Sequence, residues 1–288
     1  MCPLPQFGLG ARALRGYKDL LRGAGLRTES GRTLPVAEER KGIQDRLHDE
    51  RGGGSLAKYR RLVVGNVGFL GFLRYEFVTG LFGSCPGALG FALRALFYPP
   101  LFRECGRKVI FGRHLTVRHP DRIRLGSRVV LSDGVVLDAK GEEGEGILIR
   151  DGVFVGLHTV VTCSDGSIEL DEKCNLGAFC RVGSHGRTRI GKKALLAAYC
   201  YVVGAGHESS RTDIPILDQP NTTKGGAEIG DGCWLGARVT VMDGVKIGRD
   251  TIVGAHALVT RDLPDFSIAV GIPAKVTGSR LKDAPPAA

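Results

Sequence analysis

The chain has 288 residues, a net charge of +10 and eight cysteines, none of them in a CxxC pair. This length suits one large domain or two modest ones, and the abundance of glycine (43 residues) beside few aromatics (7%) favours many tight turns. The absence of zinc-finger spacing and of a basic–aromatic pattern argues against nucleic-acid binding. The positive charge suits a solvated arginine-rich surface, an anionic cofactor or an anionic membrane surface.

Residues 1–55 mix Gly, Arg and Glu without sustained periodicity and end in RGGGS. We expect them to form a flexible N-terminal extension. The irregular cysteine spacing and the absence of a secretory signal at the start predict a reducing, cytoplasmic environment.

Residues 56–106 are strongly apolar, but GSCPG at 83–87 interrupts their uncharged core. A membrane-spanning helix needs about 20 apolar residues without such a break, so two short helices in a hairpin are expected instead. The hairpin either caps the next domain or lies on the inner membrane face through residues 69–102. The second alternative would bring nearby cations to the lipid headgroups, and these cations are Lys58, Arg60, Arg61, Arg74 and Arg94.

An internal repeat of six residues begins after residue 107 and is clearest from Ile229: IGDGCW LGARVT VMDGVK IGRDTI VGAHAL VTRDLP. Hexads group in threes, and the 18 lead positions are all aliphatic. These leads are Leu125, Leu131, Leu137, Ile149, Val155, Val161, Leu170, Leu176, Val182, Ile190, Leu196, Val202, Ile229, Leu235, Val241, Ile247, Val253 and Val259. A weaker fragment suggests a partial coil at Phe111 and Val117.

Every insertion falls after a third hexad, and the longest occupies residues 208–228. This regularity predicts coils of three flat faces whose insertions all leave one corner, with the lead residues stacked inside. The fifth position of each hexad should also point inward, so Cys174, Cys180, Cys200 and Cys233 are interpreted as small buried residues.

The coils resemble the left-handed parallel β-helix of hexapeptide-repeat acyltransferases, in particular the maltose/galactoside O-acetyltransferase-like group and its bacterial surface-polysaccharide branch. The resemblance covers about residues 107–280. Its most specific motifs are GH at 206–207, the loop 208–228, WLGA at 234–237 and VGIPAKV at 270–276. It implies an all-β fold of six to seven coils over residues 107–264, followed by a strand and tail at 265–288.

His207 ends its hexad at the corner where the longest insertion leaves the coil. An imidazole so placed can take a proton from an acceptor hydroxyl as that oxygen attacks a thioester. The alternative is a surface histidine beside a loop. The matching histidine of the family is the general base, and the resemblance implies that role for His207.

The resemblance also implies an acyl donor, acetyl-CoA, and no required metal. It places Trp234 and Ala237 near the thioester, with the Ala237 N–H facing the oxyanion. Ala255 and Thr260 match pantetheine contacts, and Arg261 and Lys275 match positions near the nucleotide phosphates. The alternative for Ala237, Ala255 and Thr260 is ordinary packing within the coil, and the alternative for the two cations is plain exposure to solvent.

The acceptor side departs from the family pattern. Family sites often carry an asparagine thirty residues before the catalytic histidine, where this chain has Gly177, and the nearest asparagine is Asn175. In the loop, Arg211 and Asp213 either orient a polar acceptor or pin the loop down. An acceptor of the maltose or galactoside kind is therefore not implied.

The predicted function is an acetyl-CoA-dependent O-acetyltransferase acting on a sugar hydroxyl of a polysaccharide or glycolipid precursor. The resemblance further implies a homotrimer with active sites between subunits, in the cytoplasm or peripheral on the inner membrane face. The alternatives are an N-acetyltransferase of an amino sugar or xenobiotic, and a non-catalytic trimeric scaffold. A γ-class carbonic anhydrase is disfavoured, because its zinc histidines would have to come from the irregular first coil, at His114 and His119.

Overall fold

The computed structural model describes residues 54–141 and 143–281, all within one compact unit, Lys41–Ala288. Residues 1–53 of the expected N-terminal extension, and residues 282–288 of the expected tail, lie outside this range.

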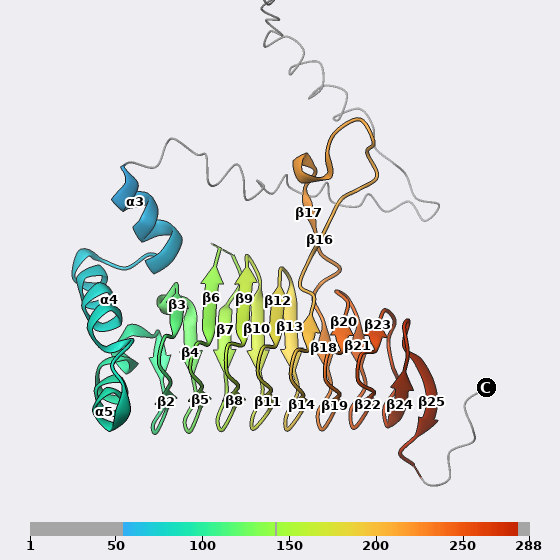
Figure 1. Ribbon diagram of the computed structural model, residues 1–288. Helices are drawn as coiled ribbons and strands as arrows, with labels where there is room; N and C mark the ends of the chain where they lie inside the picture. The colour runs from blue at the N-terminus through green and yellow to red at the C-terminus, as the bar shows by residue number, and fades with distance from the viewer. Residues whose placement is uncertain (1–53, 142, 282–288) are drawn as a thin grey trace, which may run out of the picture. The chain divides into compact units, whose positions relative to one another are not determined.

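The chain from residue 104 to residue 259 winds through seven coils, and each coil adds one short strand to each of three parallel sheets (Figure 1). Face A comprises β1 (Glu104–Cys105), β4 (Ile123–Leu125), β7 (Gly146–Ile149), β10 (Ser167–Leu170), β13 (Arg187–Ile190), β18 (Glu228–Ile229) and β21 (Lys246–Ile247). Face B comprises β2 (Ile110–Phe111), β5 (Val130–Leu131), β8 (Phe154–Val155), β11 (Asn175–Leu176), β14 (Leu195–Leu196), β19 (Trp234–Leu235) and β22 (Ile252–Val253). Face C comprises β3 (Thr116–Arg118), β6 (Val136–Lys140), β9 (Val160–Ser164), β12 (Arg181–Ser184), β15 (Tyr201–Val202), β20 (Thr240–Val241) and β23 (Leu258–Val259).

The lead residues of the hexads form the core, as the repeat predicts. Each pairs in register with its equivalent one coil away: Leu176 with Leu196, and Leu196 with Leu235. All 18 are at most 3% exposed. The fold class, a left-handed parallel β-helix, is confirmed: each lead residue stacks on its equivalent one coil away, and the insertions of different length all leave at the corner between coils.

The first coil is more complete than the sequence suggests. Cys105 pairs with Leu125 on face A, and Phe111 pairs with Leu131 on face B. Cys105 therefore holds the lead position of a full coil, which the search for aliphatic leads misses. The helix has seven coils, and His207 follows the fifth.

The interior cysteines fill space between the lead residues. Cys174, Cys180, Cys200 and Cys233 are each at most 1% exposed, and Cys163 on β9 is equally buried. Every cysteine of the described part of the chain is a free thiol.

A helical region precedes the coils, and its two main helices lie on either side of the GSCPG break. Its elements are α3 (Ser55–Tyr59), the π-helical turn η2 (Arg60–Val64), α4 (Phe69–Phe82), α5 (Gly87–Phe97) and the 3₁₀ turn η3 (Pro99–Leu101). Within the described residues no single helix is long and apolar enough to cross a membrane. Only the bent pair of 55–64 and 69–82, which meet at 73°, passes that test by length and composition.

The hairpin of α4 and α5 is fastened to the first coil by two polar side chains. The Tyr75 hydroxyl donates to the carbonyl of Val117 (2.8 Å). Arg94, 3% exposed, donates to the carbonyls of Phe111 (2.9 Å) and Cys85 (2.7 Å). The inner face of α4 is thereby held against the open end of the coil.

The other end of the coil carries a short hairpin. Strand β24 (Ser267–Val270) continues face B parallel to β22, and β25 (Lys275–Ser279) folds back on it antiparallel. Figure 1 shows this pair and the helices at opposite ends of the coil.

Candidate active site

An arm leaves the coil after β15, at the corner between faces C and A. Strand β16 (Gly206–His207) pairs antiparallel with β17 (Asn221–Thr222), so that His207 lies opposite Asn221 (Figure 1). The Glu208 N–H donates to the carbonyl of Pro220 (2.9 Å) and extends this ladder. His207 therefore stands on a paired strand rather than on a free loop.

The His207 side chain is exposed, and its ring makes no hydrogen bond to any other described residue. Both ring nitrogens are accordingly available to a ligand. A fixed backbone with an uncommitted imidazole is the arrangement that a general base needs.

Gln219 closes the tip of the arm. This residue is 4% exposed, and its amide nitrogen donates to the carbonyls of Arg211 (2.8 Å) and Ile214 (3.3 Å). Its amide oxygen accepts from the Arg211 N–H (3.3 Å). The short helix η5 (Ile216–Asp218) lies just before it. Gln219 was not among the predicted site residues, because a single glutamine in an irregular loop carries no signal.

Arg211 and Asp213 bind each other, with Nε of Arg211 donating to Oδ1 of Asp213 (3.0 Å). The side-chain hydrogen bond from Arg211 lowers the pKa of the Asp213 carboxyl below its ordinary value. Both side chains are exposed. In this structure the pair is part of the arm's own framework, which favours the pinning role over direct orientation of an acceptor.

Asp243 holds the segment by which the arm returns to the coil. The Asp243 carboxylate accepts hydrogen bonds from the backbone N–H groups of Lys224 (2.6 Å) and Gly226 (2.9 Å). Gly226 has φ of +98°, and a Cβ there would collide with the carbonyl of Arg187. Asp243 and Gly226 thus fix the second strand of the arm, a role that the VMDG motif by itself did not reveal.

A second group of predicted residues lies on face B and at the corner between faces B and C. Trp234 on β19 is 50% exposed and lies in register between Leu195 and Ile252. Ala237 and Ala255 occupy successive turns of the corner. The N–H groups of these two alanines make no hydrogen bond to any residue that the structure describes. Both can therefore donate to a ligand that lies along this corner.

The close packing of successive corners fixes the backbone positions of these two alanines. A Cβ on Gly236 would lie 2.6 Å from the backbone nitrogen of Ala255, so only glycine fits there. On the earlier coils the same corner carries rings: His158 stacks on Phe179 (5.3 Å between centroids) and Phe179 on Tyr199 (5.1 Å). The corner is a rigid edge along most of the coil.

The remaining donor-side residues lie on the last coil and beyond it. Thr260 and Arg261 follow β23 at the corner between faces C and A, and Lys275 begins β25. All three are exposed. Neither cation has an ion-pair partner among the residues described, so both are open to an anionic ligand.

Asn175 and Gly177 lie on the fourth coil. Asn175 is exposed on face B, separated from Trp234 by Leu195 in the register. A Cβ at Gly177 would lie 2.7 Å from the backbone nitrogen of Ala198. An asparagine cannot be placed at position 177 without moving that backbone, so the departure from the family pattern is part of the coil geometry.

The predicted residues fall into separate places in one chain. His207, Arg211 and Asp213 belong to the arm at the corner between faces C and A, whereas Trp234 and Ala237 lie on face B and its far corner. Within a single chain the structure does not bring these two groups together.

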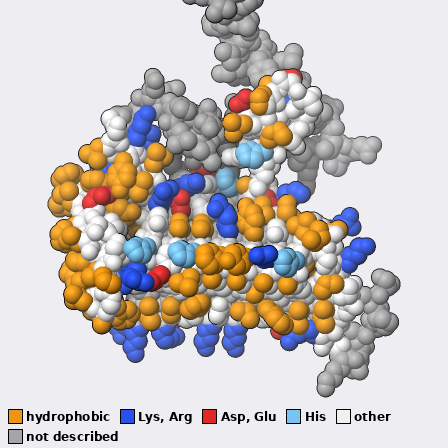
Figure 2. All heavy atoms as spheres, in the orientation of Figure 1, with side chains coloured by type: hydrophobic (Ala, Val, Ile, Leu, Met, Phe, Trp, Pro, Cys, Tyr) orange, Lys and Arg blue, Asp and Glu red, His pale blue; other side chains and the backbone are white. Residues whose placement is uncertain are grey.

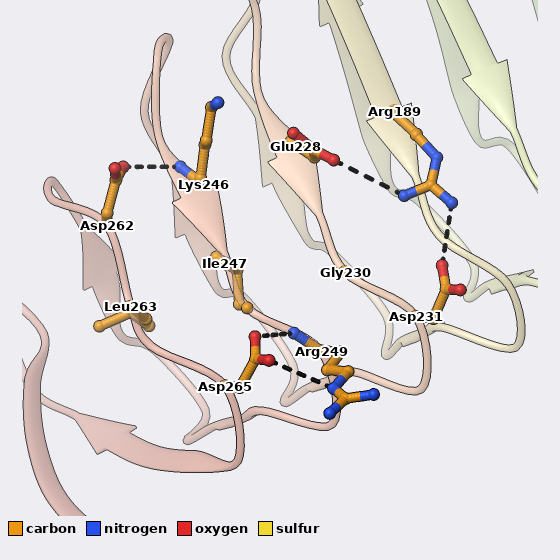
Figure 3. A pocket seen from close by; sticks show the side chains of 11 residues that line it. Arg189, Glu228, Gly230, Asp231, Lys246, Ile247, Arg249, Asp262, Leu263 and Asp265 are labelled. Carbon is orange, nitrogen blue, oxygen red and sulfur yellow. Dashed lines mark hydrogen bonds and ion pairs between the residues drawn. The ribbon is translucent and has the colours of Figure 1, made fainter.

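A hollow of the surface lies elsewhere, on face A of the last three coils (Figure 3). It has a volume of about 470 Å³ and contains none of the predicted site residues. Most of its carboxylates already have partners in the chain: the backbone N–H and Nε of Arg249 donate to Asp265 (3.0 and 3.2 Å), and the backbone N–H of Lys246 donates to Asp262 (2.8 Å). An open, internally paired surface is a weaker candidate than the arm.

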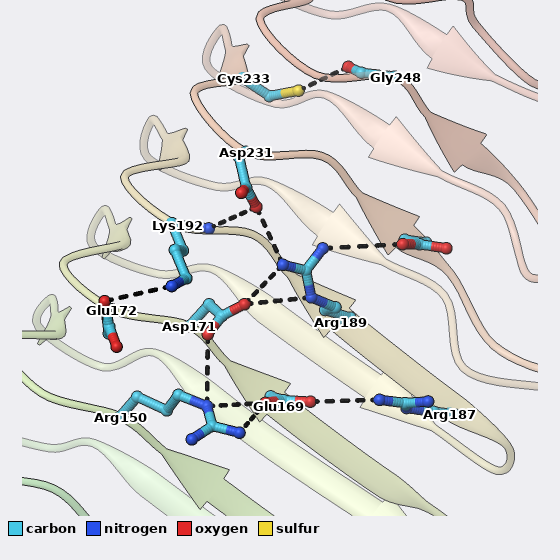
Figure 4. Close-up of polar contacts among 11 residues, drawn as sticks. Arg150, Glu169, Asp171, Glu172, Arg187, Arg189, Lys192, Asp231, Cys233 and Gly248 are labelled. Atoms are coloured by element: carbon cyan, nitrogen blue, oxygen red, sulfur yellow. Dashed lines mark hydrogen bonds and ion pairs between the residues drawn. The ribbon is translucent and has the colours of Figure 1, made fainter.

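Face A as a whole is a network of ion pairs (Figure 4). Arg150 lies 2.6 Å from Glu169, and Arg189 lies 2.6 Å from Asp171 and 2.9 Å from Asp231. These contacts connect successive coils. The network is therefore structural.

No group of three His, Cys, Asp or Glu side chains in the described residues is arranged to hold a metal ion. The histidines of the first coil have other contacts. His114 lies 3.4 Å from the Ser84 hydroxyl, and His119 lies 3.1 Å from the carbonyl of Arg61.

Comparisons with known proteins agree with the repeat. Residues 226–261 match the family model "Bacterial transferase hexapeptide (six repeats)". The chain is 32% identical over 165 residues to a probable acetyltransferase of Mycobacterium tuberculosis, Rv3034c, a match that covers 55% of each chain. It is 26% identical over 117 residues to the putative lipopolysaccharide biosynthesis O-acetyl transferase WbbJ of Escherichia coli, covering 38% of this chain and 60% of WbbJ.

Among solved structures, the chain is similar to AntD, an N-acyltransferase from Bacillus cereus in complex with dTDP and coenzyme A. That likeness has a TM-score of 0.44 and 19% identity, and covers 63% of this chain and 86% of AntD. The matches to the two curated relatives span little more than half of their length.

Proposed function

This chain is a hexapeptide-repeat protein related to bacterial acetyltransferases, and from that premise we propose that it transfers an acyl group from acyl-CoA to a sugar hydroxyl. The observation that carries the proposal is the exposed, uncommitted imidazole of His207 on the paired root of the arm. Acetyl-CoA is the expected donor.

His207 is the general base in the proposed reaction. The acceptor hydroxyl gives its proton to a ring nitrogen of His207 while its oxygen attacks the thioester carbonyl carbon. The carbonyl oxygen becomes an oxyanion, to which the unused N–H of Ala237 donates a hydrogen bond. The tetrahedral intermediate then collapses, the C–S bond breaks, and the leaving thiolate of CoA takes the proton from His207.

The donor lies along the corner of Ala237 and Ala255 in this proposal. The N–H of Ala255 meets a pantetheine carbonyl one coil below the thioester. Thr260 and Arg261 lie at the corner between faces C and A, so in this proposal they meet the donor from the neighbouring subunit. The unpaired cations Arg261 and Lys275 bind the phosphates at the end of the coil. Trp234, exposed beside this corner, supplies an apolar wall.

The acceptor in this proposal is a sugar hydroxyl. WbbJ, a relative by sequence, is described as a lipopolysaccharide biosynthesis O-acetyl transferase, which favours a hydroxyl of a polysaccharide or glycolipid sugar. Asn175, exposed on the face that carries Trp234, is the polar side chain proposed to meet that sugar.

The proposed assembly is a homotrimer with shared sites. His207 and Ala237 lie at different corners of one chain, so a site that contains both needs the arm of one subunit beside the corner of its neighbour. Face B offers a surface for such packing, because Ile110, Phe154, Leu195 and Trp234 are each at least 38% exposed on it.

A transfer assay tests the reaction. The full chain is incubated with acetyl-CoA and a panel of neutral sugars, amino sugars and glycolipid glycans, and free CoA thiol is followed while products are identified. Alkali-labile esters support the proposal. Amides formed only on amino sugars would replace it with N-acyl transfer, and a folded protein that neither transfers nor hydrolyses acetyl-CoA would support a scaffold.

A subunit-mixing experiment tests the shared site. His207→Asn and Trp234→Ala chains are purified separately and after co-expression. If each site takes His207 from one subunit and Trp234 from the next, equal co-expression restores about a quarter of wild-type activity by random assembly of closed trimers. No recovery in mixed trimers would place both residues in one subunit's site.

A further inference from the structure

The hairpin of α4 and α5 is apolar on two sides. On its inner side Phe72 and Val78 are buried against the coil end. Its outer side is exposed, and no part of residues 54–281 covers it. The exposed side chains there are Phe69 (66%), Leu70 (81%), Leu73 (46%), Phe77 (58%), Leu81 (57%), Leu89 (67%), Phe91 (47%) and Leu96 (66%).

Figure 2 shows hydrophobic side chains gathered at the helical end of the coil. Helices that are apolar all round are normally buried on every side, and exposed patches of this size mark a contact with something else. The hairpin cannot turn this side inward, because Tyr75 and Arg94 fasten its other side to the first coil.

Charges around the hairpin are almost all positive. From residue 54 to residue 102 the chain has Lys58, Arg60, Arg61 and Arg74 besides the buried Arg94, and Glu76 is the single acid. Glu76 accepts a hydrogen bond from the Tyr59 hydroxyl (2.8 Å). An apolar surface with a cationic margin is complementary to an anionic lipid bilayer.

A second copy of the chain fits this surface less well. Packing two such hairpins face to face would cover the apolar side chains but would bring the cations of both copies together. Like charges across an interface oppose association. Anionic headgroups remove that repulsion and release the apolar side chains from water at the same time.

We propose that the outer side of α4 and α5 is a membrane-docking surface. It holds the protein peripherally on an anionic bilayer, with the leucine and phenylalanine side chains inserted to the depth of the headgroup–acyl boundary. The cations at 58–74 lie among the phosphates. This proposal stands on the hairpin alone and does not need an enzymatic activity.

Combined with the proposed function, docking also limits how far from the membrane the acceptor hydroxyl can lie. The arm of His207 leaves the fifth coil, four steps of about 4.8 Å from the first, so it lies roughly 19 Å along the coil from the docked end. A lipid-linked glycan extends a few sugars from its headgroup and reaches this height. This step rests on the proposed function, whereas the docking surface does not.

Vesicle flotation of the full chain tests the surface. The probes are vesicles of phosphatidylcholine mixed with phosphatidylglycerol, and vesicles of phosphatidylcholine alone. The wild type is expected to float with the anionic vesicles, and added salt should weaken this binding. The variant Leu70→Glu/Leu81→Glu should bind at least about tenfold more weakly, because two inserted leucines are lost and two negative charges are added.

Leu281→Glu is the matched control. Leu281 is 55% exposed, close to the 57% of Leu81, but it follows β25 at the opposite end of the coil. This variant should float like the wild type, and circular dichroism checks that every variant is folded. The charge contribution is measured with Arg60→Gln/Arg61→Gln, which should lower binding to the anionic vesicles only.

Two results would overturn the proposal. One is a wild type that stays in solution with both kinds of vesicle. The other is lipid-free self-association of the wild type that Leu70→Glu/Leu81→Glu abolishes, since this would make the hairpin a protein–protein interface. Neither result bears on acyl transfer, so the proposed function can fail or hold independently.

Discussion

His207 lies opposite Asn221 on the antiparallel ladder that forms the root of the arm. The pairing fixes the backbone of the proposed base while its ring remains exposed. The position of the histidine is therefore set by the coil corner and the returning strand together.

Replacing this ring should abolish most of the activity. We expect His207→Asn to lower kcat by about 10²- to 10⁴-fold, the usual contribution of a general base. The KM for acetyl-CoA should change little, because the proposed donor contacts are made by Ala237, Ala255 and the two cations rather than by the imidazole ring. Steady-state kinetics measures both. The control His114→Asn removes an equally exposed histidine from the first coil and should be as active as the wild type; equal losses in both variants would exclude a specific role for His207.

The two unpaired cations near the coil end should govern donor affinity. Arg261→Gln/Lys275→Gln is expected to raise the KM for acetyl-CoA by roughly ten- to hundredfold through the loss of charged hydrogen bonds. The kcat should remain close to that of the wild type. With acetyl-pantetheine, which lacks the nucleotide, wild type and variant should behave alike. A large effect that persists with this short donor would contradict phosphate binding.

Gln219 should hold the arm in shape. Gln219→Ala removes three hydrogen bonds within the loop and leaves the carbonyls of Arg211 and Ile214 without that donor, a local cost of about 0.5–1.5 kcal/mol for each bond lost. We expect faster proteolysis and hydrogen exchange within 208–220, together with a lower kcat. The melting temperature of the coil should hardly move. Ser209→Ala, in the same arm, serves as the control, and equal exchange in the two variants would speak against the role of Gln219.

The lead residues should carry the stability of the coil. Leu196 is fully buried, so Leu196→Ala should lower the free energy of unfolding by about 2–5 kcal/mol. Leu81→Ala, at a side chain that is 57% exposed, should cost about 0.5 kcal/mol or less in lipid-free buffer. Urea unfolding at fixed protein concentration measures the difference, and similar losses would contradict the stacked core.

The buried thiols should make the fold sensitive to alkali. Burial raises the pKa of the Cys174 thiol to about 12, from an ordinary value of 9.0. Because the folded pKa is the higher one, the neutral thiol adds stability that is complete below pH 9 and is lost as the pH rises toward 12. The expected slope is about 1.4 kcal/mol per pH unit for one such group. Urea unfolding of wild type and Cys174→Ala should show a gap in stability that narrows from pH 8 to pH 10.5; a constant gap would exclude the thiol as its source.

The coil architecture was predictable because the repeat is redundant. A lead residue such as Leu196 is flanked by equivalents one coil away in both directions, so the pattern survives single exceptions. The first coil lacked this redundancy. Its lead residues on faces A and B are Cys105 and the aromatic Phe111 in place of aliphatic residues, so only part of it was recognised.

The arm was predictable as an insertion but not as a structure. Its strands contain only two residues each, Gly206–His207 and Asn221–Thr222, too few to leave a periodic signal. Its order depends on single side chains, Gln219 and Asp243, that hydrogen-bond to backbone distant in sequence. Such contacts follow from the folded path of the chain and not from local composition.

The separation of the site residues also needed the structure. His207, Trp234 and Ala237 are all consistent with one reaction, and hexad counting alone places each at a corner or a face. Only the assembled coil shows that the arm and the corner of Ala237 lie apart within one chain. Because His207 and Ala237 lie apart, the expected trimer can be tested by mixing subunits that carry different substitutions.

The elements that cover the ends of the coil affect how copies of the chain can assemble with one another. A solenoid with bare ends presents unpaired strand edges on which further copies could add indefinitely, as they do in fibrils. Here α4 and α5 cover one end, and the reversed strand β25 covers the sheet of face B at the other. Addition of further copies along the axis is thereby hindered at the helical end and on face B. The same devices that cap the fold therefore also disfavour the stacking of copies end to end into filaments.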